Sequence, residues 1–389
     1  MGKRSGKRSE KTVSQQMENP PKKTVAVFFG GASNESEISV ITGMYAVNLL
    51  RGARWHVLPV YLPPEGGMLL GNYKSVSEFS GTPKGTFVTL SDGALVRAGK
   101  RKPLARIDVA LNCCHGGMGE DGTLAALLRW NKIPSASPAQ AESAVFMDKS
   151  LTKIAARGLD IPVAPALTVT EQSWRADALQ IKAQVAAFGY PVVVKPARLG
   201  SSIGLTVAHG EETLADALEL AFTLDDKALI ERYYPEKRDI NCAACKMGGE
   251  VITSPCEEVF SAEELLSYAE KYKKGKGSQC PADLPTSVSA QIEANTRRLY
   301  EAFGMRGVVR ADFLVVGEQA YFNELNTVPG SLAGYLFGHS LSQIRDFFAG
   351  LLDEALREGS SEKQTIRTGI LRENVFSGTK GCKRRGNFV

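Results

Sequence analysis

The sequence predicts an α/β and α+β protein of several domains, whose N-terminal part is an open parallel sheet. Three observations lead to this prediction. Apolar strand-like segments alternate with helical segments over residues 24–130, which is typical of a parallel sheet with ligand sites at the carboxyl ends of its strands. A compact mixture of strands and helices follows up to residue 231. From residue 240 onward strands predominate.

The whole chain has the composition of an ordinary globular protein. Its 389 residues are 43% hydrophobic and 23% charged, which suits two or three domains with sizeable cores. No apolar run approaches the roughly 18 residues that span a bilayer, and no hydrophobic stretch follows the basic N-terminus, so we expect a cytoplasmic protein. The seven cysteines are widely spread, which favours reduced thiols over a disulfide framework.

Charge is distributed unevenly along the chain. Residues 1–23 and residues 359–389 each contain seven Lys or Arg and two acidic residues, whereas the net charge of the chain is +5. The body between these tails is therefore mildly acidic and gives no reason to expect nucleic-acid binding. The tails have the composition of disordered extensions, and attachment to an anion or a nucleic acid is the alternative interpretation.

Turn-forming residues separate the predicted elements of the N-terminal part. Residues 63–105 are rich in Gly, Pro and Lys, and no element is predicted there. The expected strands are residues 24–29, 56–62 and 108–112, and the expected helices are residues 35–50 and 121–130.

The central and C-terminal parts begin after a linker that contains Pro134 and Pro138. A loop rich in Lys and Gly is expected at residues 270–280. The expected helices are residues 141–157, 211–223, 287–303 and 341–358, and the expected strands are residues 191–195, 205–208, 228–231, 308–316 and 320–326.

A predicted β-hairpin carries three oxygen-bearing side chains on one face. With a three-residue turn at positions 317–319, Asp312 faces Glu324 across the ladder. Arg310 then faces Asn326. Two opposed carboxylates repel each other unless a cation lies between them, and with the amide oxygen they suit Mg²⁺, or Mn²⁺, which leaves room for water and phosphate. The alternative is a solvent-facing polar side of the sheet.

Two lysines and a glycine-serine loop are candidates for binding phosphate groups. Lys195 ends an apolar strand. The glycines of the loop at residues 198–204 allow its amides and the hydroxyls of Ser201 and Ser202 to surround phosphate oxygens. Lys149 opens a helix, where a cation opposes the macrodipole and an anionic ligand would relieve the mismatch. An ordinary hairpin turn and an exposed lysine are the alternatives.

Five stretches, in this order, resemble the D-alanine–D-alanine ligases. They are VFFGGASNE at residues 27–35, HGGMGEDG at 115–122, MDK at 147–149, VKPARLGSS at 194–202, and RADF at 310–313 with NELNTVPG at 323–330. The likeness is weakest over residues 63–105 and in the tails. It implies a three-domain ATP-grasp fold, with an N-terminal domain at residues 24–141, a central subdomain at 142–231 and a metal-binding C-terminal subdomain at 232–358.

The resemblance also implies that ATP lies between the central and C-terminal subdomains. Glu231 corresponds to an adenine-contacting acid at a strand end. Asp239 stands where the family usually has a ribose-binding glutamate, and the shorter acid could still bond a ribose hydroxyl. The implied phosphate-binding residues are Lys149, Lys195, Ser202 and Lys271, and the implied magnesium ligands are Asp312, Glu324 and Asn326.

For the first D-alanine, the resemblance implies a network of Glu35, Ser201 and the loop residue Tyr272 around the ammonium group. Depsipeptide-forming relatives usually lack this tyrosine, so Tyr272 favours an amine as the second substrate. His115 corresponds to a histidine near the carboxylate of the first D-alanine. A strand-end histidine bonded to the backbone is the alternative.

For the second substrate, the sequence departs from the family pattern. The family commonly has Ser-Leu for the carboxylate of this substrate, whereas Tyr335 precedes Leu336 here. Gly334 replaces a commonly bulkier polar residue. Arg310 and the amide of Gly330 are the candidates for stabilising an oxyanion. The departure therefore concerns the second substrate more than the chemistry.

Together these features lead us to expect an ATP- and magnesium-dependent ligase that joins two D-alanines through an acyl phosphate, for peptidoglycan precursor synthesis. One alternative is another ATP-grasp carboxylate–amine ligase with a different second substrate, such as D-serine or D-lactate. Another is a non-catalytic binding protein that keeps the fold. The resemblance implies a homodimer, and we expect neither a nucleic acid nor a membrane as a partner.

Overall fold

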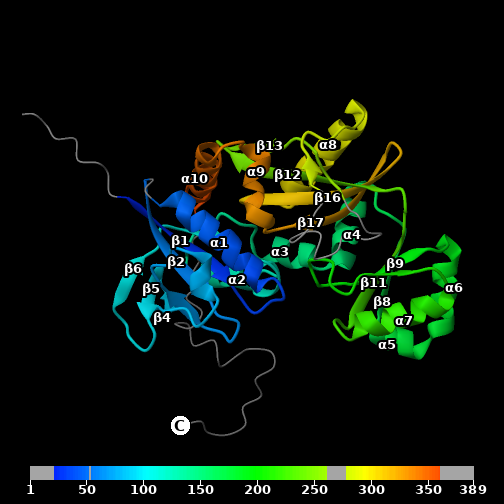
Figure 1. The fold of residues 1–389 in the computed structure, drawn as a ribbon, viewed down its shortest axis with the longest axis horizontal. Helices are drawn as coiled ribbons and strands as arrows, with labels where there is room; N and C mark the ends of the chain where they lie inside the picture. Colours follow the sequence, from blue (N-terminus) through cyan, green and yellow to red (C-terminus); the bar gives the residue numbers. More distant parts are fainter. Residues whose placement is uncertain (1–21, 52–53, 261–276, 360–389) are drawn as a thin grey trace, which may run out of the picture.

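The computed structural model describes residues 22–51, 54–260 and 277–359, which form three β-sheets with flanking helices (Figure 1). Lys271 and Tyr272 lie outside the described residues, as do most residues of the two tails. In Figure 1 the N-terminal sheet lies at the left, the C-terminal sheet at the top and the central sheet at the lower right. Within the described ranges, no helix is long and apolar enough to cross a membrane.

The N-terminal sheet has a parallel centre and an antiparallel edge. β1 (Lys23–Gly30) lies between β2 (Trp55–Leu62) and β7 (Val109–Asn112), and both neighbours run parallel to it, as expected. The residues for which no element was predicted supply four antiparallel strands beyond β2. They are β3 (Met68–Leu70), β4 (Thr86–Ser91), β5 (Ala94–Arg97) and β6 (Pro103–Arg106).

A two-residue turn explains the β4–β5 hairpin at this edge. Asp92 and Gly93 have positive φ angles of 42° and 75°, which the favoured two-residue hairpin turn requires. Buried and exposed residues alternate along much of β4. An Asp-Gly pair beside such an alternating strand is a recognised hairpin signal, so the sequence did contain evidence for this part of the sheet.

Alternate side chains of β1 enter two different cores. Val25, Val27 and Phe29 share one core with α1 (Ser36–Leu50). Ala26 and Phe28 share the other with α2 (Thr123–Trp130). Because successive side chains of a strand point to opposite faces, this arrangement buries both faces of the sheet centre.

The central sheet is antiparallel, in the order β10-β9-β11-β8, and has its own hydrophobic core. The predicted segments around residues 191–231 form strands and a helix as expected, and β8 with two further helices precedes them. The strands are β8 (Ala166–Thr170), β9 (Val192–Pro196), β10 (Thr206–Ala208) and β11 (Lys227–Arg232), and the helices are α5 (Glu171–Ala176), α6 (Ala178–Phe188) and α7 (Glu211–Phe222).

Two helices replace the single helix expected at residues 141–157. α3 (Gln140–Met147) ends and α4 (Lys149–Gly158) begins at Asp148, whose ψ of 109° is extended rather than helical. The Asp148 side chain accepts hydrogen bonds from the first amides of α4, which makes it an N-cap. Capping by Asp148 therefore divides the predicted helix and places Lys149 at the start of a new one.

The C-terminal sheet is built on the long strand β12, with β16 on one side and β13 and β14 on the other. Its strands are β12 (Arg238–Met247), β13 (Glu250–Thr253), β14 (Glu257–Val259), β15 (Ser278–Gln279), β16 (Val308–Val316) and β17 (Gln319–Asn326). The helices of this part are α8 (Thr286–Ala302), α9 (Gly334–Phe337) and α10 (Leu341–Glu358), and η4 (Gly330–Ala333) is a short 3₁₀ turn. The N-terminal part contains the 3₁₀ turns η1 (Val76–Phe79) and η2 (Gly117–Gly119).

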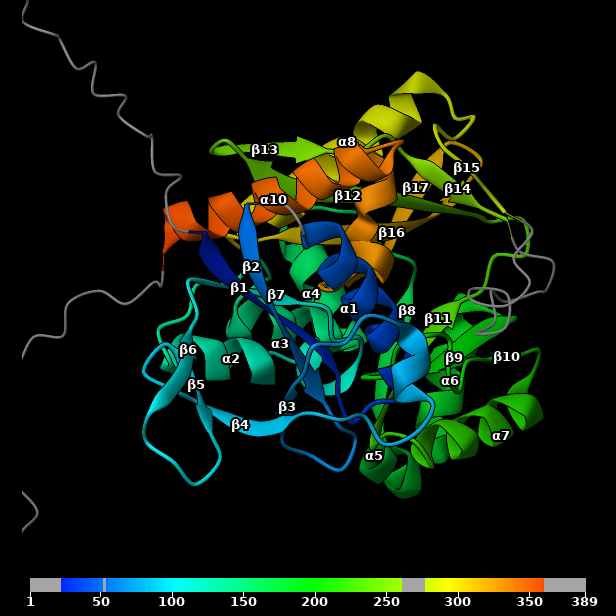
Figure 2. The same cartoon turned by 60° about the vertical axis from the view of Figure 1, so that its left-hand side comes forward.

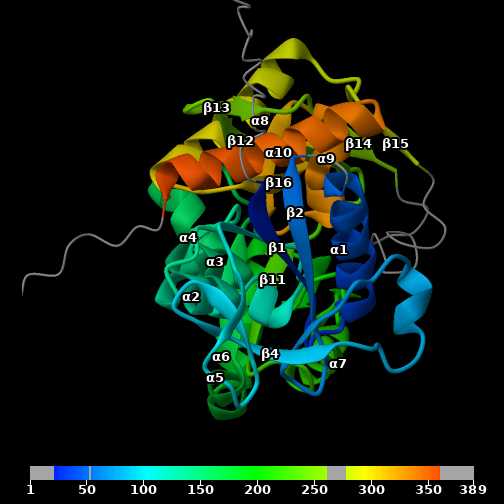
Figure 3. The ribbon, with the colours of Figure 1, turned by 90° about the vertical axis from the view of Figure 1, so that its left-hand side faces the viewer.

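Helix α10 joins the N-terminal and C-terminal sheets. Figures 2 and 3 show it between the strands β1 and β2 and the C-terminal sheet. Phe348 of α10 is fully buried, and its ring meets that of Tyr45 of α1 edge-on at 6.1 Å. The two sheets consequently share one hydrophobic core, whereas the core of the central sheet is separate.

Candidate active site

A cavity of about 740 Å³ is lined by strand residues of the central and C-terminal sheets, by loop residues, and by residues that follow strands of the N-terminal sheet. Most of the predicted site residues meet there. They are Glu35, His115, Lys149, Lys195, Ser201, Ser202, Glu231, Asp239, Arg310, Asp312, Glu324, Asn326, Gly330 and Tyr335. Leu336 is instead buried in the hydrophobic core beside α10, and Lys271 and Tyr272 fall in the undescribed segment.

β16 and β17 form the predicted hairpin, but with a different turn and with a bulge. The turn has two residues, where three are expected from the sequence. A bulge at Asn323 adds one residue to β17 and restores the predicted register, so Asp312 faces Glu324 as predicted. The predicted pairing of Arg310 with Asn326 likewise holds. The bulge also adds one side chain, that of Asn323, to the wall of the cavity.

The oxygen-bearing side chains of this hairpin are held by nearby donors. Nε and Nη2 of Arg310 donate to the two carboxylate oxygens of Asp312 at 2.7 and 2.8 Å, and Nδ2 of Asn326 donates to Asp312 at 2.9 Å. Among the described residues, no three His, Cys, Asp or Glu side chains gather into a metal site. Two opposed carboxylates and an amide nevertheless fit Mg²⁺, which takes one or two carboxylates and completes its shell with water and phosphate.

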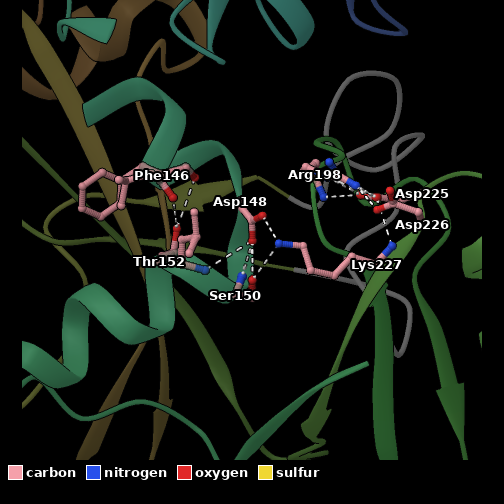
Figure 4. Close-up of polar contacts among 10 residues, drawn as sticks. Phe146, Asp148, Ser150, Thr152, Arg198, Asp225, Asp226 and Lys227 are labelled. Carbon is pink, nitrogen blue, oxygen red and sulfur yellow. Dashed lines mark hydrogen bonds and ion pairs between the residues drawn. The ribbon is translucent and has the colours of Figure 1, made fainter. Parts of the chain in front are cut away.

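Lys149 lies between the hairpin and the loop at residues 198–204. Its Nζ is 3.6 Å from Oε2 of Glu324 and donates to the carbonyl oxygen of Leu199. The start of α4 is fixed by Asp148, which caps the helix and pairs with Lys227 of β11 (Figure 4). Burial alone would raise the pKa of Asp148, but Lys227 and the Ser150 hydroxyl lower it below its ordinary value.

The loop at residues 198–204 is anchored at its base. Arg198 forms ion pairs with Asp225 and Asp226, which precede β11 (Figure 4). Ser202 near the tip has a left-handed φ of 58° and lines the cavity. Left-handed residues in a turn let successive backbone amides converge on an anion, so the loop can cradle a phosphate group.

Glu231 is buried between two lysines. Its side chain is 2% exposed, and its oxygens lie 2.6 Å from Nζ of Lys153 and 2.5 Å from Nζ of Lys195. Burial alone would raise the pKa of Glu231, but the two ammonium groups hold it at about 2. Both carboxylate oxygens therefore form ion pairs with lysines, and the expected contact of Glu231 with adenine stays a prediction. Asp239 lines the cavity and pairs with Lys237 at 2.5 Å.

Glu35 lies at a point of close backbone approach. Oγ of Ser201 donates to Oε1 of Glu35, so the structure brings these two predicted residues together. A Cβ atom at Gly116 or Gly200 would lie 2.8 or 2.6 Å from Oε2 of Glu35. Larger residues at these two positions would displace the carboxylate, which explains the glycines around it.

His115 and Glu120 follow β7 and have strongly shifted pKa values. Burial lowers the pKa of His115 to about 4, and its Nε2 lies 2.8 Å from Oγ1 of Thr42. Burial and the charge of Glu35 raise the pKa of Glu120 to about 8. The Glu120 carboxylate accepts from the amides of Gly116 at 2.9 Å and Val328 at 3.1 Å, and so connects the N-terminal and C-terminal parts.

Tyr335 lies on α9, directly after the η4 turn. Its hydroxyl donates to Oε2 of Glu257 at 2.9 Å, and Nδ2 of Asn241 donates to the same oxygen at 3.3 Å. Burial raises the pKa of Tyr335, so the hydroxyl keeps its proton near neutral pH. The tyrosine therefore places a hydrogen-bonded Tyr–Glu pair at the wall of the cavity, beside Arg310.

Four further residues, not predicted individually, contact the predicted ones. Glu120 was within a recognised motif, and Lys153 follows Lys149 by four positions, which puts both on one side of a helix. These signals could have identified them. Asn323 was also within a recognised motif, although a bulge decides where its side chain lies. Glu257 carries no local signal, because a contact between separate segments places it.

Comparisons with known proteins agree with this geometry. The family models described as D-ala D-ala ligase N-terminus and C-terminus match residues 24–138 and 155–344. The D-alanine–D-alanine ligase of Thermosipho africanus is 31% identical, over 89% of this chain and 97% of that protein. The solved D-alanine–D-alanine ligase of Helicobacter pylori has a TM-score of 0.69 at 29% identity, covering 88% of this chain and 100% of that one.

A second solved structure is named for a different second substrate. The VanG D-Ala:D-Ser ligase of Enterococcus faecalis has a TM-score of 0.73 at 25% identity, covering 85% of this chain and 99% of that one. The matching family models and the similarity over nearly the full length of these proteins agree with the three-sheet architecture. This chain belongs to the D-alanine–D-alanine ligase family of enzymes, which have the ATP-grasp fold.

Proposed function

We propose that this chain joins two D-alanines into D-alanyl-D-alanine, with ATP as the phosphoryl donor, for the synthesis of peptidoglycan precursors. The observation that carries the proposal is the meeting of three groups in one cavity: the lysines 149 and 195, the opposed carboxylates of β16 and β17, and Glu35. Membership of the ligase family supports the same reaction.

In this proposal the ATP phosphates bind Lys149, Lys195 and the amides of the loop at residues 198–204. Asp312, Glu324 and Asn326 would hold Mg²⁺. The ion supplies positive charge to the phosphate oxygens when it is bound. The two lysines add to that charge, and Nζ of Lys149 lies 3.6 Å from Oε2 of Glu324. Asp239 lines the same cavity and can bind a ribose hydroxyl.

The ammonium group of the first D-alanine binds Glu35, whose carboxylate Ser201 orients. The carboxylate of this D-alanine attacks the γ-phosphorus of ATP, which forms an acyl phosphate and releases ADP. His115 has a pKa of about 4 and is neutral at physiological pH, so it contributes a hydrogen bond and no charge near this carboxylate.

The neutral amine of the second D-alanine then attacks the carbonyl carbon of the acyl phosphate. A tetrahedral oxyanion forms, phosphate leaves with the C–O bond electrons, and the amine loses a proton. Arg310 and the amide of Gly330 stabilise the oxyanion, each by about 3 kcal/mol if they resemble other oxyanion donors. The reaction needs no protein nucleophile.

D-serine is the second candidate for the acceptor. The hydrogen-bonded pair of Tyr335 and Glu257 at the cavity wall favours it, because the Glu257 carboxylate can accept a hydrogen bond from a substrate hydroxyl. A direct comparison of D-alanine, D-serine and D-lactate as second substrates, with the product identified by mass, decides between these acceptors.

The first test is the reaction itself. Incubation with ATP, Mg²⁺ and D-alanine should release ADP and give a product with the mass of the dipeptide. Lys195→Ala should lower ADP formation to background, because the variant loses a buried phosphate-binding charge. Full D-alanine-dependent turnover by this variant would remove Lys195 from the mechanism.

We further propose that the protein acts in the cytoplasm as a homodimer. The cysteines recorded among the described residues are unpaired, which suits a reducing compartment. Light scattering of the purified protein gives its mass in solution, and a monomer at assay concentration would contradict the dimer.

A further inference from the structure

A second lysine of α4, Lys153, is buried behind the wall of the cavity. Its side chain is 2% exposed, and its Nζ forms an ion pair with Oε1 of Glu231 at 2.6 Å. The same nitrogen donates to the carbonyl oxygen of Phe322, beside the bulge of β17, at 3.1 Å. A buried ammonium group is unfavourable unless it is paired, so these contacts account for its presence in the interior.

Glu231 connects this buried lysine to the cavity. Its second oxygen lies 2.5 Å from Nζ of Lys195, which lines the cavity. Nζ of Lys195 also donates to Oδ1 of Asn323, the bulge residue, at 3.0 Å. Elements from the central and C-terminal sheets therefore converge on a chain of charges, Lys153–Glu231–Lys195, which runs from the interior to the cavity.

The charge of this chain depends on Lys153. With both lysines and the carboxylate ionised, the three residues carry a net charge of +1. Without Lys153, the Glu231 carboxylate would neutralise Lys195, and Lys149 alone would present net positive charge to the phosphate groups. The ammonium of Lys195 has three N–H donors. Glu231 and Asn323 take two of them, which leaves one for a ligand in the cavity.

We propose that Lys153 is a positioning residue for nucleotide binding: through Glu231 it fixes the ammonium group of Lys195 and keeps the local charge positive. The inference rests on the proposed role of Lys195 in binding ATP phosphates. It gives Glu231 an electrostatic role within the wall of the cavity. Lys153 itself touches neither the cavity nor the substrates.

The test is a set of charge-matched variants. Lys153→Met should weaken ADP binding, measured by calorimetry, and raise the KM for ATP by about 10- to 100-fold, as happens when a group that orients a ligand-binding residue is removed. The KM for D-alanine should change much less, because Glu35 lies elsewhere in the cavity. Lys153→Arg should retain most of the ADP affinity.

The double variant Lys153→Met/Glu231→Gln restores the net charge of +1, which then resides on Lys195, with the carboxylates of Glu324 and Asp239 nearby. We expect it to recover most of the ADP affinity lost by Lys153→Met, and circular dichroism of each variant shows whether it folds. Lys246→Met serves as the control, since Lys246 pairs with Glu358 at 2.9 Å and does not line the cavity. It should leave ADP binding unchanged.

The outcomes separate the two proposals. Unchanged ADP affinity in Lys153→Met, or a double variant that binds ADP no better than a folded Lys153→Met, would overturn the positioning role. If Lys153→Met does not fold, the positioning role would also be overturned by a double variant that folds like wild type but binds ADP more than about tenfold more weakly. A wild-type protein that neither binds ADP nor makes the dipeptide would instead refute the proposed function.

Discussion

Glu120 illustrates how burial changes the ionisation of a single side chain in this cavity. Burial and the neighbouring charge of Glu35 raise its pKa from 4.5 to about 8. The folded protein therefore holds the Glu120 proton over a pH range in which the unfolded chain has lost it. By linkage, the stabilisation is complete below about pH 4.5 and is lost as the pH rises through the folded pKa.

Glu120→Gln should remove this dependence, since an amide does not ionise. In the ligand-free protein we expect the variant to gain stability relative to wild type as the pH rises from 5 to 9. A gain of about 1 kcal/mol would raise Tm by roughly 2–4 °C. Thermal unfolding across this range measures the difference. Glu318→Gln, in the exposed β16–β17 turn, is the control, and parallel curves for wild type and Glu120→Gln would contradict the shifted pKa.

The start of α4 depends on one capping side chain. Asp148 caps the helix through one oxygen and pairs with Lys227 through the other (Figure 4). The cap interrupts the helix between α3 and α4, and this interruption sets the position of Lys149 at the cavity. The two interactions can be separated, because asparagine is also a good N-cap but has no charge.

Asp148→Asn should lose only the ion pair with Lys227, whereas Asp148→Ala should lose the ion pair and the cap. We expect the alanine variant to be less stable than the asparagine variant by about 1 kcal/mol, the usual contribution of an N-cap. Urea unfolding gives both values. Equal free energies of unfolding for the two variants would show that the cap does not stabilise α4.

The hydrophobic cores divide the protein differently from the order of its sheets. The N-terminal and C-terminal sheets share a core through α1 and α10, although more than a hundred residues separate them in sequence. The central sheet lies between them in sequence but has its own core. Unfolding of the central sheet should therefore leave the other two together.

Phe348→Ala and Leu218→Ala test this division. Both side chains are fully buried, and each substitution should cost about 2–5 kcal/mol. Hydrogen exchange should accelerate in both β1 and β12 for Phe348→Ala, and only in β8–β11 and their helices for Leu218→Ala. Faster exchange in β1 after Leu218→Ala, to the same extent as in β9, would mean that all three sheets unfold as one.

Local residue patterns were enough to predict many elements and much of the site. A strand at residues 308–316 and a helix at residues 341–358 were predicted, and these are the bounds of β16 and α10. Asp312 and Glu324 were placed opposite each other because side chains alternate along strands. Lys149 and Lys195 were found by their positions at element ends.

The predictions failed where several weak signals competed or where contacts are distant in sequence. The Asp92-Gly93 turn was overlooked within a segment rich in turn-forming residues. The bulge at Asn323 was missed because an error of one residue in the turn cancelled it. Periodicity reports which face of an element is apolar, and it is insensitive to one inserted residue near a strand end.

Composition and motif order predicted the family and the kind of chemistry, and they named most of the residues that line the cavity. The pairing of Lys153 with Glu231, of Tyr335 with Glu257 and the environment of Glu120 became visible only in the folded chain. Charges and hydrogen bonds act over a few ångströms in space and depend on burial, and the spacing of residues along a chain does not record either quantity.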